Sequence, residues 1–209
     1  MRLRRALFGG LVGVAATGLW LLLAGPSRLL GIDTGNAGIA LLLTVTWVSL
    51  YAVSQMRNGD LDHAVSPGEW RAWIGFAFTA AIAVYALANA AAFQGPPLWQ
   101  NPDANRIGRN IAVLAIAWMI LSQVLEGRWR GRVQEDERDR EIAARGGHAA
   151  RIALSLYAIG LALLLGFSPA ARLHWAPPPM VAHLLIIGLV LSCLVEYLVV
   201  ASSHWRDRR

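Results

Sequence analysis

Two glutamates stand out because each lies in or at the end of a long apolar stretch. Glu196 lies inside the last apolar run of the chain, and Glu126 closes an earlier one. An ionisable group in a membrane is costly to desolvate and frequently functional. With the polar residues nearest to them, these carboxylates could form a proton- or cation-linked site. The candidate residues are Glu196, Glu126, Gln123, Ser122 and Ser192.

The same glutamates also fit a purely structural role, which we favour. Arg71 and Arg151 begin neighbouring apolar stretches and could pair with the carboxylates, or the carboxylates could reach the membrane surface along their flexible stems. Neither glutamate lies at the middle of its stretch, and no stretch is visibly interrupted, as transporter sites usually require. The sequence therefore predicts neutralised glutamates and keeps a small transporter or channel as the alternative.

The segment from Gly127 to Arg151 is the longest polar stretch and holds seven of the nineteen basic residues, all arginine. Its residues 135–145 are expected to form a short helix, with acidic residues in the first turn, where the helix dipole favours them. Favourable i,i+4 pairs are expected for Asp136–Arg140 and Glu141–Arg145. The Gly146-Gly147 pair is expected to end this helix.

This charged helix has two interpretations, a solvated surface helix or a docking surface for a partner. The residues of the candidate docking surface are Glu135, Asp136, Glu137, Arg138, Asp139, Arg140 and Glu141. Clustered arginines beside a membrane also attract acidic lipid headgroups. The candidate headgroup-binding residues are Arg128, Arg130 and Arg132.

Other chemistry finds little support in the sequence. The five histidines lack the spacing of a metal site, and the single cysteine lies in an apolar run. No phosphate-binding glycine loop and no GxSxG or HExxH motif is present. The basic charge has no polar folded domain to carry it, which argues against nucleic acid. We expect no enzyme, no metal and no cofactor, and a structural or interfacial role for His183.

The elements that carry these residues follow from the composition, which is 56% apolar and only 15% charged. A membrane-spanning helix needs about 20 apolar residues. Six charge-free intervals of 16 to 31 residues give six candidate spans, and turn residues fall between them. The sequence thus predicts an all-α integral membrane protein with six transmembrane helices in three in–out–in hairpins. The spans are residues 6–24, 36–56, 71–93, 108–126, 150–167 and 179–201.

The first span, after Arg2, Arg4 and Arg5, could instead be a signal peptide. Its apolar run is longer than the usual 7–15 residues, and no Ala-x-Ala site follows, so we expect a retained helix. With the N-terminus inside, fifteen of the nineteen arginines fall on the cytoplasmic side. The positive-inside rule then places both termini in the cytoplasm.

Small residues four apart favour close helix packing in membranes. Such pairs are Gly9/Gly13, Ala77/Ala81, Ala86/Ala90 and Ala158/Ala162. They predict contacts with another membrane subunit, with a second copy or within the chain.

Two motifs resemble those of a family of uncharacterised bacterial multi-pass membrane proteins. One is the Asp136–Ile142 heptapeptide, DERDREI, which leads into an apolar helix. The other is Ser66-Pro67-Gly68-Glu69-Trp70-Arg71-Ala72-Trp73, an SPxExxAW-type segment. The resemblance covers about residues 66–209 and implies the bacterial inner membrane. It implies no activity, although such proteins are often encoded beside helix-turn-helix regulators.

The expected organisation is a transmembrane hairpin at 1–57, followed by a four-helix transmembrane region at 66–209 with a cytoplasmic loop at 127–150. The expected function is that of a non-catalytic accessory or regulatory membrane protein. It would act through helix packing in the bilayer and through the charged loop, with a membrane subunit, a second copy or a cytoplasmic protein as partner.

Overall fold

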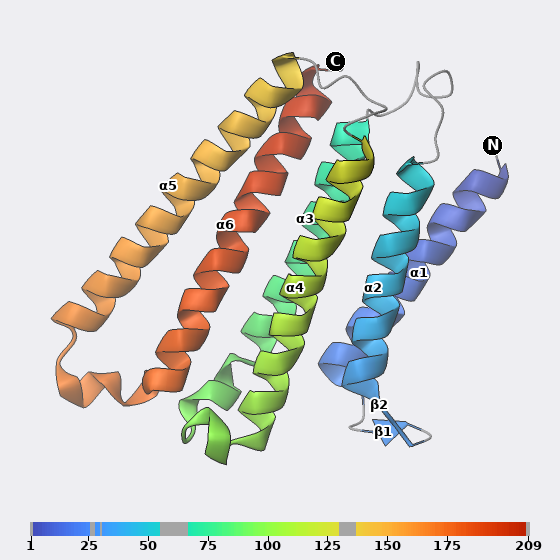
Figure 1. The fold of residues 1–209 in the computed structure, drawn as a ribbon. Helices are drawn as coiled ribbons and strands as arrows, with labels where there is room; N and C mark the ends of the chain where they lie inside the picture. Colours follow the sequence, from blue (N-terminus) through green and yellow to red (C-terminus); the bar gives the residue numbers. More distant parts are fainter. Residues whose placement is uncertain (1, 26–27, 30, 55–66, 130–136, 208–209) are drawn as a thin grey trace. The chain divides into compact units, whose positions relative to one another are not determined.

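The computed structural model is almost entirely helical and describes residues 2–25, 28–29, 31–54, 67–129 and 137–207 (Figure 1). Its helices are α1 (Arg2–Ala24), α2 (Thr34–Ser54), α3 (Pro67–Ala88), α4 (Pro102–Trp129), α5 (Glu137–Phe167) and α6 (Pro178–Asp207). Short 3₁₀ helices follow α3 and α5, namely η2 (Ala90–Gln94), η3 (Leu98–Gln100) and η4 (Ala170–Trp175).

Four of these helices are long and apolar enough to cross a membrane, which supports the expected helical membrane protein. They are Thr34–Tyr51, Gly68–Ala88, Glu137–Phe167 and Pro178–Asp207. In α1 the apolar part found by the same criterion, Gly10–Ala24, is shorter, and α4 does not meet the criterion within the described residues. The described chain therefore supports four spans directly.

The chain divides into two compact units. Unit 1 comprises residues 1–67 and 110–134, and unit 2 comprises residues 68–109 and 135–209. Helix α4 contributes its first residues to unit 2 and its remainder to unit 1. The two units are described separately below.

Unit 1 is built on the antiparallel pair of α1 and α2. Between them lies a ribbon that the sequence does not predict, formed by β1 (Arg28–Leu29) and β2 (Ile32–Asp33) around Gly31, whose φ is 83°. The Asp33 carboxylate accepts a 3.0 Å hydrogen bond from the backbone N–H of Asn36, which caps the start of α2. The ribbon and the cap together fix the tight return of the chain.

The two helices of this pair approach most closely at two glycines. A Cβ atom on Gly38 would lie 2.6 Å from the backbone oxygen of Gly18, and one on Gly18 would lie 3.1 Å from the backbone oxygen of Gly38. Only glycine allows backbones to come so close, which is how membrane helices gain dispersion contacts. The Gly18–Gly38 contact is thus the crossing point of unit 1.

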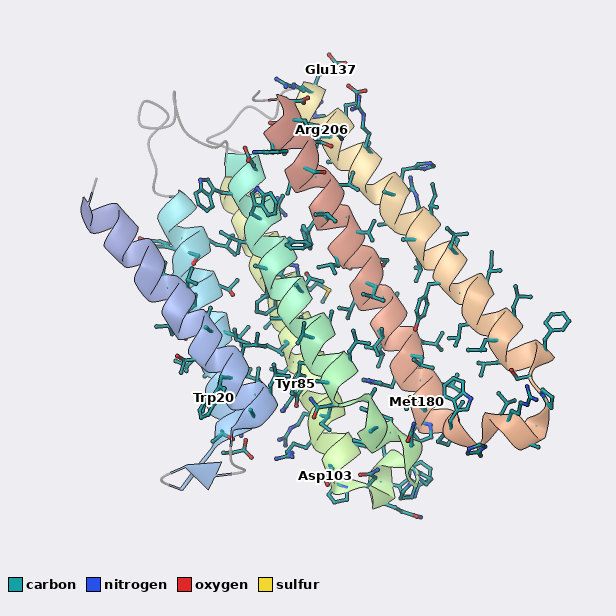
Figure 2. The ribbon with its side chains drawn as sticks, turned by 180° about the vertical axis from the view of Figure 1, so that it is seen from behind. Trp20, Tyr85, Asp103, Glu137, Met180 and Arg206 are labelled. Carbon is teal, nitrogen blue, oxygen red and sulfur yellow. The ribbon has the colours of Figure 1, made fainter. Side chains whose placement is uncertain are left out.

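Unit 2 contains the longest helices, α5 and α6, which run side by side in opposite directions and are joined through η4 (Figure 1). At 31 and 30 residues they are each about 45 Å long, which exceeds the hydrocarbon thickness of about 30 Å. Glu137 and Arg206 lie at one end of the pair and Met180 at the other (Figure 2). Both helices must therefore extend beyond the apolar layer.

The expected helix break at Gly146-Gly147 is wrong, because α5 continues through both glycines. Gly146 is buried against α6, where a Cβ atom would lie 2.6 Å from Val200 Cγ2 and 3.2 Å from the backbone oxygen of Glu196. A Cβ on Gly147 would meet nothing within 4 Å. Gly146 therefore allows α5 to pack closely on α6 within a continuous helix.

Candidate functional site

The structure divides the five residues of the predicted ion site between the two units. Glu196 and Ser192 lie on α6 in unit 2, whereas Ser122, Gln123 and Glu126 lie on the part of α4 that belongs to unit 1. The side chains of Gln123 and Glu126 fall outside the described set. No single unit therefore assembles the predicted constellation.

The two serines of this set use their hydroxyl groups locally. Ser192 donates a 2.8 Å hydrogen bond to the backbone oxygen of Leu189, and Ser122 donates a 2.9 Å bond to that of Met119. Such bonds back to the preceding helical turn satisfy the hydroxyl proton without any ligand. The geometry gives these serines a local structural role.

Glu196 is half-buried on α6, near Gly146 of α5. Among the residues that the structure describes, it forms no ion pair with Arg71, Arg151 or any other cation. The predicted neutralisation of Glu196 by an arginine is thus not formed in this part of the chain. Glu196 is thus a half-buried carboxylate of α6 that could accept a proton or a cation.

The charged segment is the part of the prediction that the structure positions most clearly. Residues 137–147 form the first three turns of α5, continuous with its apolar part. Arg138 contacts Asp207 at the end of α6, with Nη2 2.9 Å from Oδ2, and His204 Nδ1 lies 4.0 Å from Asp139 Oδ1. These contacts clasp the charged end of α5 to α6.

One side of the charged segment is buried and the rest is exposed. Ile142 is only 2% exposed and lies one helical turn before the buried Gly146, while Arg140 and Glu141 are exposed. The predicted Glu141–Arg145 pair is confirmed at 2.6 Å. The predicted Asp136–Arg140 pair lies outside the described residues, as does the start of the docking surface at Glu135.

The clasp itself should contribute little to stability. The Arg138 and Asp207 side chains are 58% and 42% exposed, and ion pairs in such positions are worth about 0–1 kcal/mol. We expect a double-mutant cycle with Arg138→Ala and Asp207→Ala to give a coupling free energy of at most about 1 kcal/mol. The measurement is the free energy of unfolding of the four proteins, and a coupling of several kcal/mol would contradict this assignment.

The most buried polar group of the described spans was not singled out as a site from the sequence. His183 on α6 is 1% exposed, and its Nε2 lies 3.0 Å from the backbone oxygen of Ala86 on α3. Its ring stacks on Phe93 of η2, with centroids 3.9 Å apart and planes 8° apart. Because a carbonyl oxygen only accepts, the ring proton is on Nε2.

This junction completes the end of α3, whose last carbonyl groups have no partner within the helix. The Asn89 side chain donates to the backbone oxygen of Tyr85 at 2.9 Å, and His183 donates to that of Ala86. Asn101 then donates to the backbone oxygen of Ala92 and accepts from the N–H of Ala104, which caps α4. The expected structural role of His183 thus takes a specific form, a side-chain cap between distant helices.

The other predicted sites can be placed only in part. The side chain of Arg128 and the whole of Arg130 and Arg132 lie outside the described residues, so the headgroup site stays a prediction. Among the described residues, no three His, Cys, Asp or Glu side chains are close enough together to hold a metal ion. In comparisons with known proteins, no family model, no curated protein and no solved structure matches this chain.

Proposed function

We propose that this chain is a non-catalytic accessory or regulatory protein of a bacterial inner membrane that presents the charged end of α5 to a partner. The observation that carries the proposal is the continuity of α5 between its charged and apolar parts. A single helix held by α6 projects residues 137–147 about 16 Å along its axis. The exposed residues of this segment include Arg140, Glu141 and Arg145.

The proposal includes a topology of six spans in three in–out–in hairpins, with both termini and the charged segment in the cytoplasm. Its support is the distribution of the arginines, since cytoplasmic segments of bacterial membrane proteins are rich in Lys and Arg. Helices α1 and α4 would be the two further spans beside the four described above. Reporter fusions at residues 60 and 134 should then show cytoplasmic activity, and a fusion at residue 97 should not.

The partner can be a neighbouring membrane subunit, a second copy or a cytoplasmic protein, and contact-dependent crosslinking distinguishes them. A photoreactive residue placed at Ala144, which is exposed between Arg140 and His148, should form a crosslink in intact cells. The matched control is the same residue at Ala171, exposed on η4 at the other end of unit 2. Mass spectrometry of the adduct then identifies the partner.

The charge reversal Arg140→Glu should abolish the crosslink from Ala144, because it inverts the charge pattern without breaking a described ion pair. The matched reversal Arg172→Glu on η4 should leave the crosslink unchanged. A crosslink that survives Arg140→Glu, or that forms equally from both positions, would overturn the docking proposal.

A second candidate function, a small proton- or cation-linked transporter, is favoured by one observation. Glu196 is half-buried on a membrane-crossing helix without an ion pair among the described residues. Proteoliposomes holding the wild type or Glu196→Gln separate the candidates. Ion-dependent flux that the variant loses would support transport, and equal background flux from both would exclude it.

A further inference from the structure

His183 makes a contact that depends on a single protonation state of its ring. His183 donates its Nε2–H to the backbone oxygen of Ala86 and stacks its ring on Phe93, so one side chain makes both contacts. The remaining nitrogen, Nδ1, is buried and has no hydrogen-bond partner. In the neutral ring Nδ1 carries only a lone pair, and an unmet acceptor is a modest cost.

Protonation would turn this nitrogen into a charged donor with nothing to receive its hydrogen bond. A buried charge without a partner is far more costly than a buried neutral acceptor. The ring would have to leave its site to reach water or a polar partner. That movement would release the end of α3 from α6 and unstack Phe93 of η2.

The elements around the ring supply no countercharge. Helix α3 carries no charged residue after Arg71, η2 carries none, α5 carries none from Ile152 to Phe167, and α6 carries none before Glu196. At the end of unit 2 where the His183 ring lies, the other titratable side chains of these stretches are Tyr85 and Tyr157. Tyr157 donates its own proton to the backbone oxygen of Leu184 at 2.8 Å.

The neighbouring turns carry charges only on exposed side chains. On α4, Asp103 is 75% exposed and lies 3.6 Å from Arg106. On η4, Arg172 and His174 are also exposed. Within the described part of unit 2, no carboxylate is therefore available to stabilise a protonated His183 in place.

We propose that His183 is a proton-sensitive latch, whose neutral ring ties the end of α3 and η2 to α6 and whose protonation releases them. The proton binds the released state and not the latched state. By linkage, the latch is complete well above pH 6.5, because about 6.5 is the ordinary pKa of an imidazole, and it weakens as the pH falls below that value. The latched fraction relative to the released one should decrease by up to about tenfold per pH unit.

Hydrogen exchange of the full-length protein in lipid nanodiscs tests the latch. The readout is the protection factor of the amides in residues 89–94, corrected for the intrinsic pH dependence of exchange. The wild type should lose about tenfold or more in protection between pH 7.5 and pH 5.5. His183→Gln keeps a neutral donor for the Ala86 oxygen, so its protection should not change over this range.

The matched control is His174→Gln, which removes an exposed histidine of the same unit and should keep the full pH response. If His183→Gln does not fold, a variant that keeps His183 alone among the histidines decides the question. Its four changes are His63→Gln, His148→Gln, His174→Gln and His204→Gln. Loss of the response in this variant, an unchanged wild type, or a response that survives His183→Gln would each overturn the proposal.

Discussion

Replacing Gly146 with leucine should force α5 away from α6 at their charged end and lower the free energy of unfolding by about 1–3 kcal/mol. The new side chain would collide with Val200 and with the backbone oxygen of Glu196, which a Cβ alone would approach to 3.2 Å. A backbone atom cannot rotate away as a side chain does. The helix pair must therefore separate, and its dispersion contacts are lost along with the Arg138–Asp207 clasp.

The adjacent Gly147→Leu provides the control, because a Cβ at that position meets nothing within 4 Å. Leucine also has a higher helix propensity than glycine, by somewhat less than about 1 kcal/mol. Titration with a denaturing detergent, monitored by circular dichroism, measures the free energy of unfolding of both variants. Equal tolerance at the two positions would mean that the glycines do not differ in packing.

Gly38→Leu should destabilise the α1–α2 pair by about 3 kcal/mol, the upper part of the range for overpacking. Its Cβ would lie 2.6 Å from the Gly18 backbone oxygen and 3.1 Å from the Leu22 backbone nitrogen. Two backbone obstacles leave the substituted helix no local adjustment. The crossing at Gly18 must open, and the close backbone contact of the pair is lost.

The measurement is hydrogen exchange of residues 10–24, which should become faster in Gly38→Leu than in the wild type. Gly13→Leu is the control, since a Cβ there meets nothing within 4 Å and Gly13 lies on the same helix as Gly18. Unchanged exchange in Gly38→Leu, or an equal increase in Gly13→Leu, would contradict the assigned crossing.

Charge-free intervals predicted the helices well because desolvating a charge dominates where a chain can enter a bilayer. Helix α6 begins at Pro178, one residue before the predicted start of the last span, because proline costs little in the first helical turn. The spacing of small residues did not single out the Gly18–Gly38 crossing, and the contacts it predicts with another subunit stay a prediction. Gly13 and the Ala158/Ala162 pair face no described helix, whereas Gly18 and Gly38 make the contact. Spacing marks which faces allow close approach, but the partner decides which face is used.

The sites were predictable only where they are local in sequence. The Glu141–Arg145 pair follows from the helical repeat and is present. The contact of His183 with Ala86 joins residues 97 positions apart, and no pattern in either segment signals it. The Gly146-Gly147 pair misled because glycine usually weakens a helix, while burial against α6 here outweighs that preference.

The uninterrupted path of α5 also makes it a lever. Tyr157 packs against Gly188 of α6, and from this contact the axis extends about 30 Å to Glu137 and about 15 Å to Phe167. A tilt of about 10° around that point would move the charged end by about 5 Å and the opposite end by about half as much, in the opposite direction. A force on the charged turns would thus displace the far end of the helix without any change in its internal hydrogen bonds.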